Sequence, residues 1–307
     1  MNTQLPLALT ALLVLSSANA QNRTVPHELG TTTVTGTPKR IVVLENSFID
    51  ALAQLGVPAA GVAQDDAPLP HLAAYVKSVP VVGTRAQPSL ERILAVKPDL
   101  IIADVERHKS LYPQLARIAP TIVLNSYRGT YQDLREQFTL IADLTGKQER
   151  GKMLLAEHDR LFQKTKLLTN RAAGPVVIGV LAPNGFWAHS DKSFLGTLLQ
   201  DLGRKNPIKP QGDTQFVLSL EGLVATNPSA IVLLRNPGDA TPLDEWRTNP
   251  LWQNLRAVKA GRVYEFNRDL WAKGRGLLAV TKMLGQVSAS GLLRDQPAKV
   301  SFVNVAK

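Results

Sequence analysis

One stretch of this chain occurs twice, and the repetition restricts the possible folds more than any other feature. The segments SLERILAVKPDLII (89–102) and SLEGLVATNPSAIV (219–232) share six of fourteen residues at a constant offset of 130 positions. In each copy a serine stands at a predicted helix N-cap, leucine and glutamate follow in the first turn, and a proline ends the helix before an apolar run. The repeat predicts two halves that share one supersecondary unit.

Short apolar runs rich in β-branched residues alternate with helical patterns along the chain. Leu90, Ile93 and Leu94 have the spacing of a helix that buries one face. Uninterrupted apolar runs are typical of parallel strands that are covered on both faces. The alternation therefore predicts an α/β fold with largely parallel sheets. The predicted strands are 40–45, 99–104, 121–125, 176–182, 230–235 and 262–266.

Length and charge pattern predict two lobes joined by a helix. The chain has 307 residues, and a single core seldom grows beyond about 250–300 residues. Segment 147–170 lies between the two repeats, is highly charged and has a helical pattern, so we expect one long helix there. It would join an N-terminal lobe (21–146) to a C-terminal lobe (171–307) and would permit less hinge motion than a Gly-Ser linker.

The first twenty residues predict export. Residues 1–20 lack charged side chains, are apolar from Leu5 to Leu15 and end in Ala18-Asn19-Ala20, which is the pattern of a secretory signal cleaved after Ala20. The apolar run is shorter than the roughly 20 residues that a spanning helix needs. There is no cysteine to carry a lipid or to form a disulfide. We expect a periplasmic protein that is neither lipid-anchored nor embedded in the membrane.

The net charge narrows the class of ligand. A formal charge of +10 would suggest nucleic acid as the partner of a cytoplasmic protein. The export signal and the scattered distribution of the basic residues argue against nucleic acid and favour a small anionic ligand. Arg85 is the first candidate for contact with it, because it stands in a predicted turn and nothing nearby in the sequence neutralises it.

Neither a metal site nor an active site stands out. The five histidines show no i, i+3 or i, i+4 pairing, so we expect no resident metal or other cofactor. Ser193 with His108 or His189 leaves a secreted hydrolase open as an alternative. No G-x-S-x-G motif accompanies them, and a serine, a histidine and an aspartate occur in almost any chain of this length. We therefore expect no enzymatic activity.

The order of five motifs resembles a known family. The motifs TPKRIVVLE, VGTRAQPSLERILAVKPDLIIAD, a helical linker, SLEGLVATNPSAIVLL and WAKGRG resemble those of the helical-backbone periplasmic substrate-binding proteins, which deliver iron-siderophores, haem and cobalamin to ABC importers. The resemblance covers essentially the whole mature chain. It implies two Rossmann-like lobes with parallel sheets, joined by a long rigid helix, in a monomer.

The same resemblance implies a ligand. VGTRAQPSLE followed by KPDLIIADVERH is most similar to the branch that carries ferric citrate and related hydroxycarboxylate siderophores, so iron would arrive wrapped in its chelator, citrate being the first candidate. A haem-binding or cobalamin-binding member of the family is the alternative. Haem would call for a ligating side chain such as Tyr112, Tyr127 or Tyr131, and cobalamin for an aromatic cleft without an arginine cluster.

Candidate ligand-binding residues follow from the implied fold, because ligands bind beyond the carboxyl ends of parallel strands. Arginine suits a polycarboxylate, since its planar guanidinium can hold a carboxylate through two parallel N–H bonds. Ser47 could instead cap the helix that follows it. The candidates are Arg85, Arg107, Arg128, Arg275, Trp187 in the loop after 176–182, Trp271, and Ser47.

Glu91 and Glu221 occupy the same place in the two repeats. A carboxylate in the first helical turn stabilises the helix by about 0.3–1 kcal/mol, which would explain either residue alone. Their recurrence favours a matched pair of surface charges. The family resemblance implies that they dock onto arginines of the importer's permease subunits.

Overall fold

Residues 22–303 of this computed structural model are described here, and the predicted signal at 1–20 lies outside them. The N-terminal lobe is built on a four-stranded sheet in which every neighbouring pair is parallel, in the order β4-β3-β5-β6. The central strands are buried along their whole length, as their apolar runs predict. The strands are β3 (Ile41–Val43), β4 (Ala59–Val62), β5 (Leu100–Asp104) and β6 (Thr121–Leu124).

Helices cover both faces of this sheet. One face packs against α1 (Asn46–Leu55) and α6 (Tyr131–Leu144), in a core that continues into the second lobe. The other face packs against α3 (Leu90–Ala95) and α5 (Tyr112–Ile118) in a separate core. Two single-turn helices, α2 (Ala73–Val76) and α4 (Val105–His108), complete the lobe.

The C-terminal sheet is mixed rather than parallel. Its order is β11-β10-β7-β8-β9, and β8 and β9 are both antiparallel to their neighbours. Neither strand has the fully buried pattern of a central parallel strand, because β8 has an exposed residue in its middle and β9 has no buried residue. Trp187, which the sequence places in a loop, therefore lies on a strand. The bounds are β7 (Val176–Ala182), β8 (Gly185–His189), β9 (Gln215–Leu218), β10 (Ala230–Arg235) and β11 (Val263–Asn267).

Helices again cover both faces. On the face that shares its core with the first lobe lie α8 (Phe194–Asp201) and α13 (Leu277–Ser290). The opposite face packs against α9 (Leu220–Thr226) and its neighbours. The remaining elements are α10 (Leu243–Thr248), α11 (Pro250–Asn254), α12 (Arg256–Lys259), the π-helix η1 (Asp269–Lys273) and the 3₁₀-helix η2 (Leu292–Arg294).

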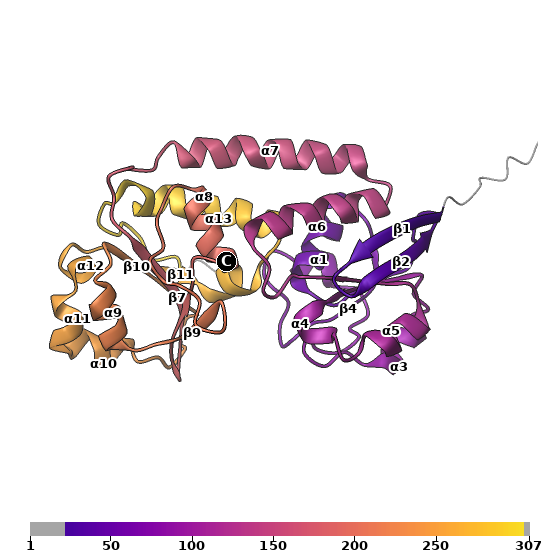
Figure 1. The fold of residues 1–307 in the computed structure, drawn as a ribbon, viewed down its shortest axis with the longest axis horizontal. Coiled ribbons are helices and arrows are strands. Elements are labelled where there is room, and N and C mark those ends of the chain that lie inside the picture. The colour runs from indigo at the N-terminus through magenta and orange to yellow at the C-terminus, as the bar shows by residue number, and fades with distance from the viewer. Residues whose placement is uncertain (1–21, 304–307) are drawn as a thin grey trace, which may run out of the picture.

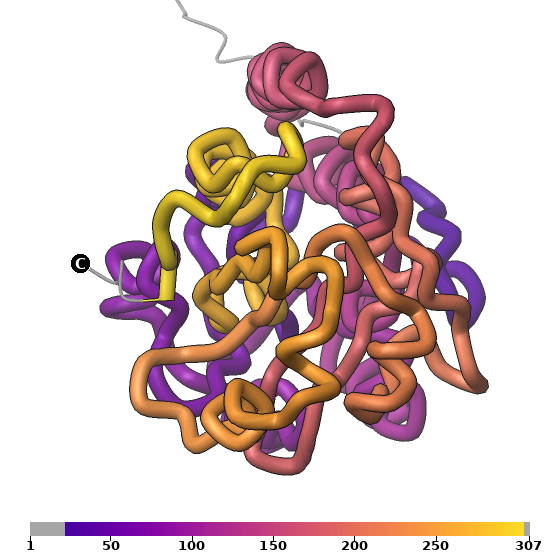
Figure 2. The backbone as a smooth tube through the Cα atoms, turned by 90° about the vertical axis from the view of Figure 1, so that its left-hand side faces the viewer, coloured from indigo at the N-terminus to yellow at the C-terminus, as the bar shows by residue number. Residues whose placement is uncertain are grey.

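The helix α7 (Gln148–Lys166) runs along the top of both lobes (Figure 1). Its 19 residues reach about 28 Å at 1.5 Å per residue. In the orthogonal view it is seen end on, outside the rest of the molecule (Figure 2). His158 of α7 contacts the hydroxyls of Tyr131 on α6 at 2.6 Å and of Thr281 on α13 at 3.1 Å. The predicted helix is thus present within 147–170, and a residue near its middle contacts one helix of each lobe.

The internal repeat is also visible in three dimensions. Ser89 caps α3 by accepting a hydrogen bond from Arg92 N, and Ser219 caps α9 by accepting one from Gly222 N. Past the end of each helix one residue adopts a left-handed conformation, with φ of 45° at Lys97 and 39° at Asn227. These two residues are again separated by the offset of the repeat, so both copies form the same unit.

A hairpin of β1 (Asn22–His27) and β2 (Gly30–Thr35) lies beside β6. Glu28 N donates to Val123 O at 3.0 Å, and the Thr32 hydroxyl donates to Thr121 O at 2.8 Å. Over the described residues, no helix has the length and apolar character needed to cross a membrane.

Candidate functional site

A cleft of about 390 Å³ lies between the two lobes. On the N-terminal side its lining comes from segments that follow β3, β5 and β6 and from the loop between α2 and α3. On the C-terminal side it comes from the β7–β8 hairpin, β9 and the segment from 268 to 275. This is the expected place for a ligand beyond the carboxyl ends of parallel strands. The lining residues are Glu45, Arg85, Arg107, Tyr127, Val180, Ala182, Asn184, Trp187, Gln215, Arg268, Ala272, Lys273 and Arg275.

Arg85 lies in this cleft but is already paired. No carboxylate close in sequence contacts it, yet Asp65 and Glu45, located 20 and 40 residues earlier, both do. Its Nη1 donates to Glu45 Oε2 at 3.1 Å, while its Nε and Nη2 donate to Asp65 Oδ2 at 2.9 and 2.5 Å. Burial opposes the charge, but Glu45 and Asp65 outweigh that effect and raise the pKa of Arg85.

Glu45 joins two of the predicted arginines. It is only 3% exposed, and its second oxygen, Oε1, lies 2.6 Å from Arg107 Nε. Burial raises the pKa of Glu45, against the opposing charges of Arg85 and Arg107. Two guanidinium groups that would repel each other are thereby held side by side.

Tyr127 lies among the cationic side chains. Its ring centroid is 4.0 Å from Arg107 Cζ, 4.4 Å from Arg128 Cζ and 5.4 Å from Arg275 Cζ. The negative face of an aromatic ring attracts cations, so the ring offsets part of their mutual repulsion. The sequence suggests Tyr127 only as an iron ligand for haem and gives no sign of this role, because two of the three arginines, Arg107 and Arg275, come from other segments of the chain.

Arg128 and Arg275 connect the lobes. Arg128 Nη2 donates to Asp213 Oδ2, in the other lobe, at 2.5 Å, and Arg128 is not among the lining residues of the cleft. Arg275 belongs to the lining and donates through Nη1 to the carbonyls of Ser126 and Tyr127 across the lobes. Burial lowers the pKa of Arg275 to about 10, against the opposing charge of Glu45, so its guanidinium stays charged at neutral pH.

Two predicted binding residues lie elsewhere. Trp271 is 0% exposed and stacks on Phe266 with ring centroids 4.4 Å apart, and its Nε1 donates to Gln286. It is part of the core because η1 turns the indole away from the cleft. Ser47 is buried as well, and its hydroxyl lies 2.6 Å from that of Ser126. The N-cap residue of α1 is Glu45, so the capping role predicted for Ser47 is wrong too.

The cleft contains polar residues that sequence reasoning missed. Arg268 and Lys273 line it beside Arg275, and Asn184 and Gln215 face it from the C-terminal lobe. Lys273 pairs with Asp269 at 2.8 Å, whereas Arg268 makes no ion pair with any carboxylate of residues 22–303. The sequence signal that could have revealed Arg268 and Lys273 is the high density of cationic residues after the strand 262–266.

The other tyrosines considered for haem are outside the cleft. The Tyr131 hydroxyl contacts buried His158, and Tyr112 packs edge-on against His27 with centroids 5.5 Å apart. Within the described residues, no group of three or more histidine, aspartate or glutamate side chains could hold a metal ion.

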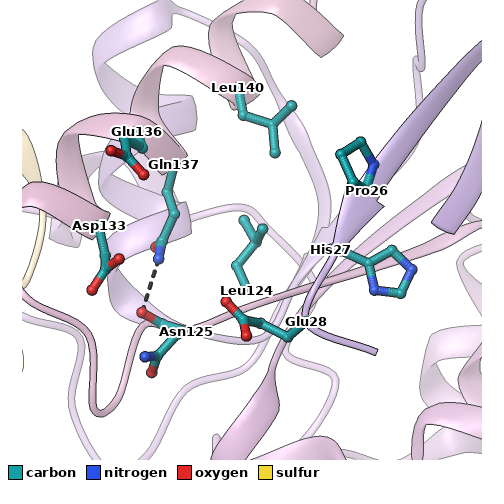
Figure 3. A pocket seen from close by; sticks show the side chains of 9 residues that line it. All are labelled: Pro26, His27, Glu28, Leu124, Asn125, Asp133, Glu136, Gln137 and Leu140. Carbon is teal, nitrogen blue, oxygen red and sulfur yellow. Dashed lines mark hydrogen bonds between the residues drawn. The ribbon is translucent and has the colours of Figure 1, made fainter. Parts of the chain in front are cut away.

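A second hollow, of about 560 Å³, lies on the N-terminal lobe between the β1–β2 hairpin and α6 (Figure 3). Gln137 Nε2 donates to Asn125 O at 2.8 Å on its wall. Its lining contains Glu28, Asp133 and Glu136 and no arginine or lysine. Its charge therefore makes it unsuitable for a carboxylate ligand, in contrast to the interlobe cleft.

Comparisons with known proteins agree with this architecture. A family model described as "Periplasmic binding protein" matches residues 41–270. The chain is 42% identical to the Fe(3+)-citrate-binding protein YfmC of Bacillus subtilis, over 85% of this chain and 83% of that protein. It is 38% identical to the Fe(3+) dicitrate-binding periplasmic protein FecB of Escherichia coli, over 89% and 90% of the two chains.

Solved structures show the same fold. SirA of Staphylococcus aureus complexed with staphyloferrin B superposes with a TM-score of 0.75 at 24% identity, covering 86% of this chain and 97% of that one. FeuA of Bacillus subtilis complexed with ferri-bacillibactin gives 0.74 at 22% identity, covering 88% and 99%. The fold predicted from the sequence is confirmed, apart from the mixed second sheet. The chain belongs to the periplasmic binding protein family.

Proposed function

We propose that this protein captures ferric citrate, or a related hydroxycarboxylate chelate of iron, and delivers it to an ABC importer. The main observation that supports this proposal is the composition of the interlobe cleft. Its lining has five cationic side chains and only one carboxylate, Glu45. The names of YfmC and FecB point to the same ligand class.

The chemistry of the cleft suits a chelate that carries several carboxylates. Each guanidinium can hold a carboxylate in bidentate fashion. Iron(III) is a hard cation and would be enclosed by the oxygens of the chelate before it reaches the protein. Arg268, which has no carboxylate partner within 22–303, and the partly exposed Arg107 are the side chains most available for direct contact.

The competing functions find less support. Tyr127 is the one haem candidate of the three that lines the cleft, and its ring is surrounded by guanidinium groups. For a hydrolase, the Ser193 hydroxyl would need a histidine, but it donates to Ser190 O at 2.7 Å and accepts from Gly196 N as the cap of α8. A buried capping hydroxyl is a poor nucleophile candidate.

Delivery to the permease would use the repeated glutamates. Glu91 and Glu221 are exposed in the first turns of α3 and α9, one in each lobe. We propose that each meets a basic residue of the importer.

The proposal includes export, cleavage after Ala20 and release without a lipid anchor. The relatives include a putative lipoprotein, YhfQ of Bacillus subtilis, at 34% identity, so the anchor differs from one relative to another. The mass of the mature protein distinguishes a free N-terminus at Gln21 from a lipidated one.

Tryptophan fluorescence provides the direct test of the ligand. Trp187 lines the cleft and is 36% exposed, so its emission should respond to a bound ligand. We expect saturable quenching by ferric citrate in the wild type and a roughly tenfold weaker response in Arg268→Gln, which loses one charged contact worth about 1.5 kcal/mol.

Controls make the result specific. Trp187→Phe should lose the signal while isothermal calorimetry still detects binding. Arg135→Gln, a change on α6 outside the cleft, should bind normally. Tighter binding of haemin or of a catecholate siderophore than of ferric citrate would contradict the proposal.

A further inference from the structure

We infer that Asp65 and Asp213 are intramolecular competitors of the ligand, which pair with Arg85 and Arg128 when the cleft is empty and give them up when carboxylates of the ligand arrive. The inference rests on the proposed function and deepens it. It assigns these aspartates a role in setting affinity and release rate.

Asp65 contacts Arg85 in the way a ligand carboxylate would. Its Oδ2 accepts from both Nε and Nη2 of Arg85, and its Oδ1 accepts from the Arg85 backbone N–H at 3.1 Å. The fork through which an arginine recognises a carboxylate is therefore already filled by the protein. A bound carboxylate can use this fork only after Asp65 has left it.

Asp213 pairs with Arg128 through one hydrogen bond, from Arg128 Nη2 to Asp213 Oδ2, and it does so across the lobes. Arg128 follows β6 of the N-terminal lobe, and Asp213 precedes β9 of the C-terminal lobe. The pair is 2.5 Å apart, and Arg128 lies against the ring of Tyr127, which lines the cleft. If Asp213 dissociated from Arg128, the Arg128 guanidinium would become available to the ligand beside the other cationic side chains of the cleft.

Exposure separates these two aspartates from Glu45. The side chains of Asp65 and Asp213 are 35% and 40% exposed, whereas that of Glu45 is 4% exposed. Glu45 holds two arginines at once, and removing a buried carboxylate from such a network is costly because it leaves buried charge uncompensated. Asp65 and Asp213 can turn into water instead. Glu45 is therefore the permanent counter-charge, and the two aspartates are the displaceable ones.

The energies permit such an exchange. A partly exposed ion pair contributes about 0.2–1 kcal/mol, so a ligand loses little affinity by breaking it. After the ligand leaves, the tethered carboxylate returns from a high effective concentration, because it cannot diffuse away. An arrangement of this kind limits affinity and favours release, which suits a protein that must hand its cargo to an importer.

The test is a gain in affinity on removing a protein carboxylate. We would measure the affinity for ferric citrate and for iron-free citrate, and the release rate of ferric citrate in a stopped-flow chase, for Asp65→Asn, Asp213→Asn and the double variant. Each single change should raise affinity by up to about fivefold and slow release by a similar factor, since about 1 kcal/mol for a partly exposed pair corresponds to that fold-change. The double variant should gain roughly the product of the two.

Two control variants make the same change in net charge. Asp66→Asn alters the residue next to Asp65. The side chain of Asp66 makes no ion pair within residues 22–303. Asp159→Asn removes an Arg135–Asp159 pair of the same 2.5 Å distance, far from the cleft on α6 and α7. Both should leave affinity within about 1.5-fold of the wild type, since the general field of one exposed charge is screened by salt.

The outcomes separate the two proposals. If the wild type binds ferric citrate but Asp65→Asn and Asp213→Asn bind equally or more weakly, the competitor role is wrong and the proposed function stands. An equal gain in affinity in Asp66→Asn would also overturn the competitor role, because the loss of one negative charge would then explain the gain. If neither the wild type nor the double variant binds any citrate, both proposals are wrong.

Discussion

At the scale of single residues, His189 is the least satisfied polar group of the second lobe. It is fully buried at the end of β8, and neither ring nitrogen has a hydrogen-bond partner within residues 22–303. Burial lowers the pKa of His189 to about 3, with help from the charges of Arg275 and Arg128. The imidazole is therefore neutral in the folded protein at any physiological pH.

Acid should destabilise the protein through this residue. Because the folded pKa lies below the ordinary 6.5, the stabilisation is fully present above pH 6.5 and is lost as the pH falls toward 3. Between pH 6.5 and 4.5 the loss amounts to about 2–3 kcal/mol. His189→Leu should flatten this part of the dependence, as measured by urea unfolding at pH 7.5, 5.5 and 4.5. Parallel curves for the two proteins would contradict the assignment.

Substitution of Tyr127 tests the contribution of a single side chain to ligand affinity. Its ring contacts three guanidinium groups, and each cation–π contact contributes about 0.5–1 kcal/mol. Tyr127→Phe should keep ferric citrate affinity within about twofold, whereas Tyr127→Leu should weaken it about tenfold, as measured by calorimetry. A loss in Tyr127→Phe equal to that in Tyr127→Leu would show that the hydroxyl matters, which would favour the haem alternative.

At the scale of elements, the start of α13 is capped from the other lobe. Its N-cap residue, Gly276, has no side chain, and Asp50 of α1 accepts hydrogen bonds from Leu278 N at 3.0 Å and Ala279 N at 3.1 Å. A Cβ at position 276 would overlap the Asp50 side chain, so glycine is required there. One carboxylate thus fixes the relative position of two helices in different lobes.

Removing this cap should weaken the molecule at its interlobe contact. Asp50→Ala leaves two buried N–H groups without acceptors and should lower the free energy of unfolding by about 1–3 kcal/mol. Asp50→Asn keeps one acceptor and should lose less. Urea unfolding at pH 5.5, below the folded pKa of about 7 for Asp50, would rank them, with Ser89→Ala as a cap inside one lobe for comparison. No difference between Asp50→Ala and Asp50→Asn would argue against the cap.

The same carboxylate predicts a pH effect of opposite sign to that of His189. Burial raises the pKa of Asp50 to about 7, although its backbone hydrogen bonds oppose the shift. A raised folded pKa means that the stabilisation is present below about pH 4 and is lost as the pH rises through 7. Asp50→Asn should remove this dependence, and the difference between its unfolding curve and that of the wild type isolates the effect.

Burial explains which elements could be predicted. The strands β5, β6, β7 and β10 are buried over all or nearly all of their length, and their apolar runs are evident in the sequence. β8 has an exposed residue in its middle and β9 has no buried residue, so their composition does not distinguish them from loops. The repeat was visible because it recurs within a short stretch of sequence.

The sequence predicts which type of residue lines the candidate site, but it does not predict how the side chains pair there. Arg85, Arg107 and Arg275 do line one cleft, because strand ends in this fold converge. That Glu45 and Asp65 neutralise Arg85 depends on side-chain directions across 40 and 20 residues, which a local pattern does not contain. Trp271 was misplaced for the same reason, since the turn of η1 decides which way it faces.

At the scale of the whole molecule, a shared hydrophobic core and several further contacts hold the lobes in one arrangement. These contacts include those of the helix α7, the Asp50 cap and the Arg275 hydrogen bonds. The helices α3 and α9 lie on the side away from α7 (Figure 1). Glu91 and Glu221 are exposed in the first turns of these two helices, with one glutamate in each lobe.

Reversing both charges tests the docking proposal. Glu91→Arg combined with Glu221→Arg should abolish ferric citrate uptake by cells while leaving the affinity of the purified protein unchanged, because neither residue lines the cleft. Glu149→Arg, a reversal on exposed α7, should leave uptake intact. If ligand affinity fell together with uptake, the two glutamates would belong to the fold or the cleft instead.

The hairpin beside β6 bears on solubility. An outer strand with free N–H and C=O groups can template pairing with another chain, and so promote aggregation. Three outer strands have part of their free edge occupied. Glu28 N pairs with β6, Phe302 N donates to Glu265 O on β11, and Val81 forms a bridge with β4. Among the outer strands of the two larger sheets, as far as residues 22–303 show them, β9 alone has no such outer partner, and it carries the half-exposed Val217. Intermolecular strand addition, if the protein is stressed, should therefore begin at β9, beside the cleft.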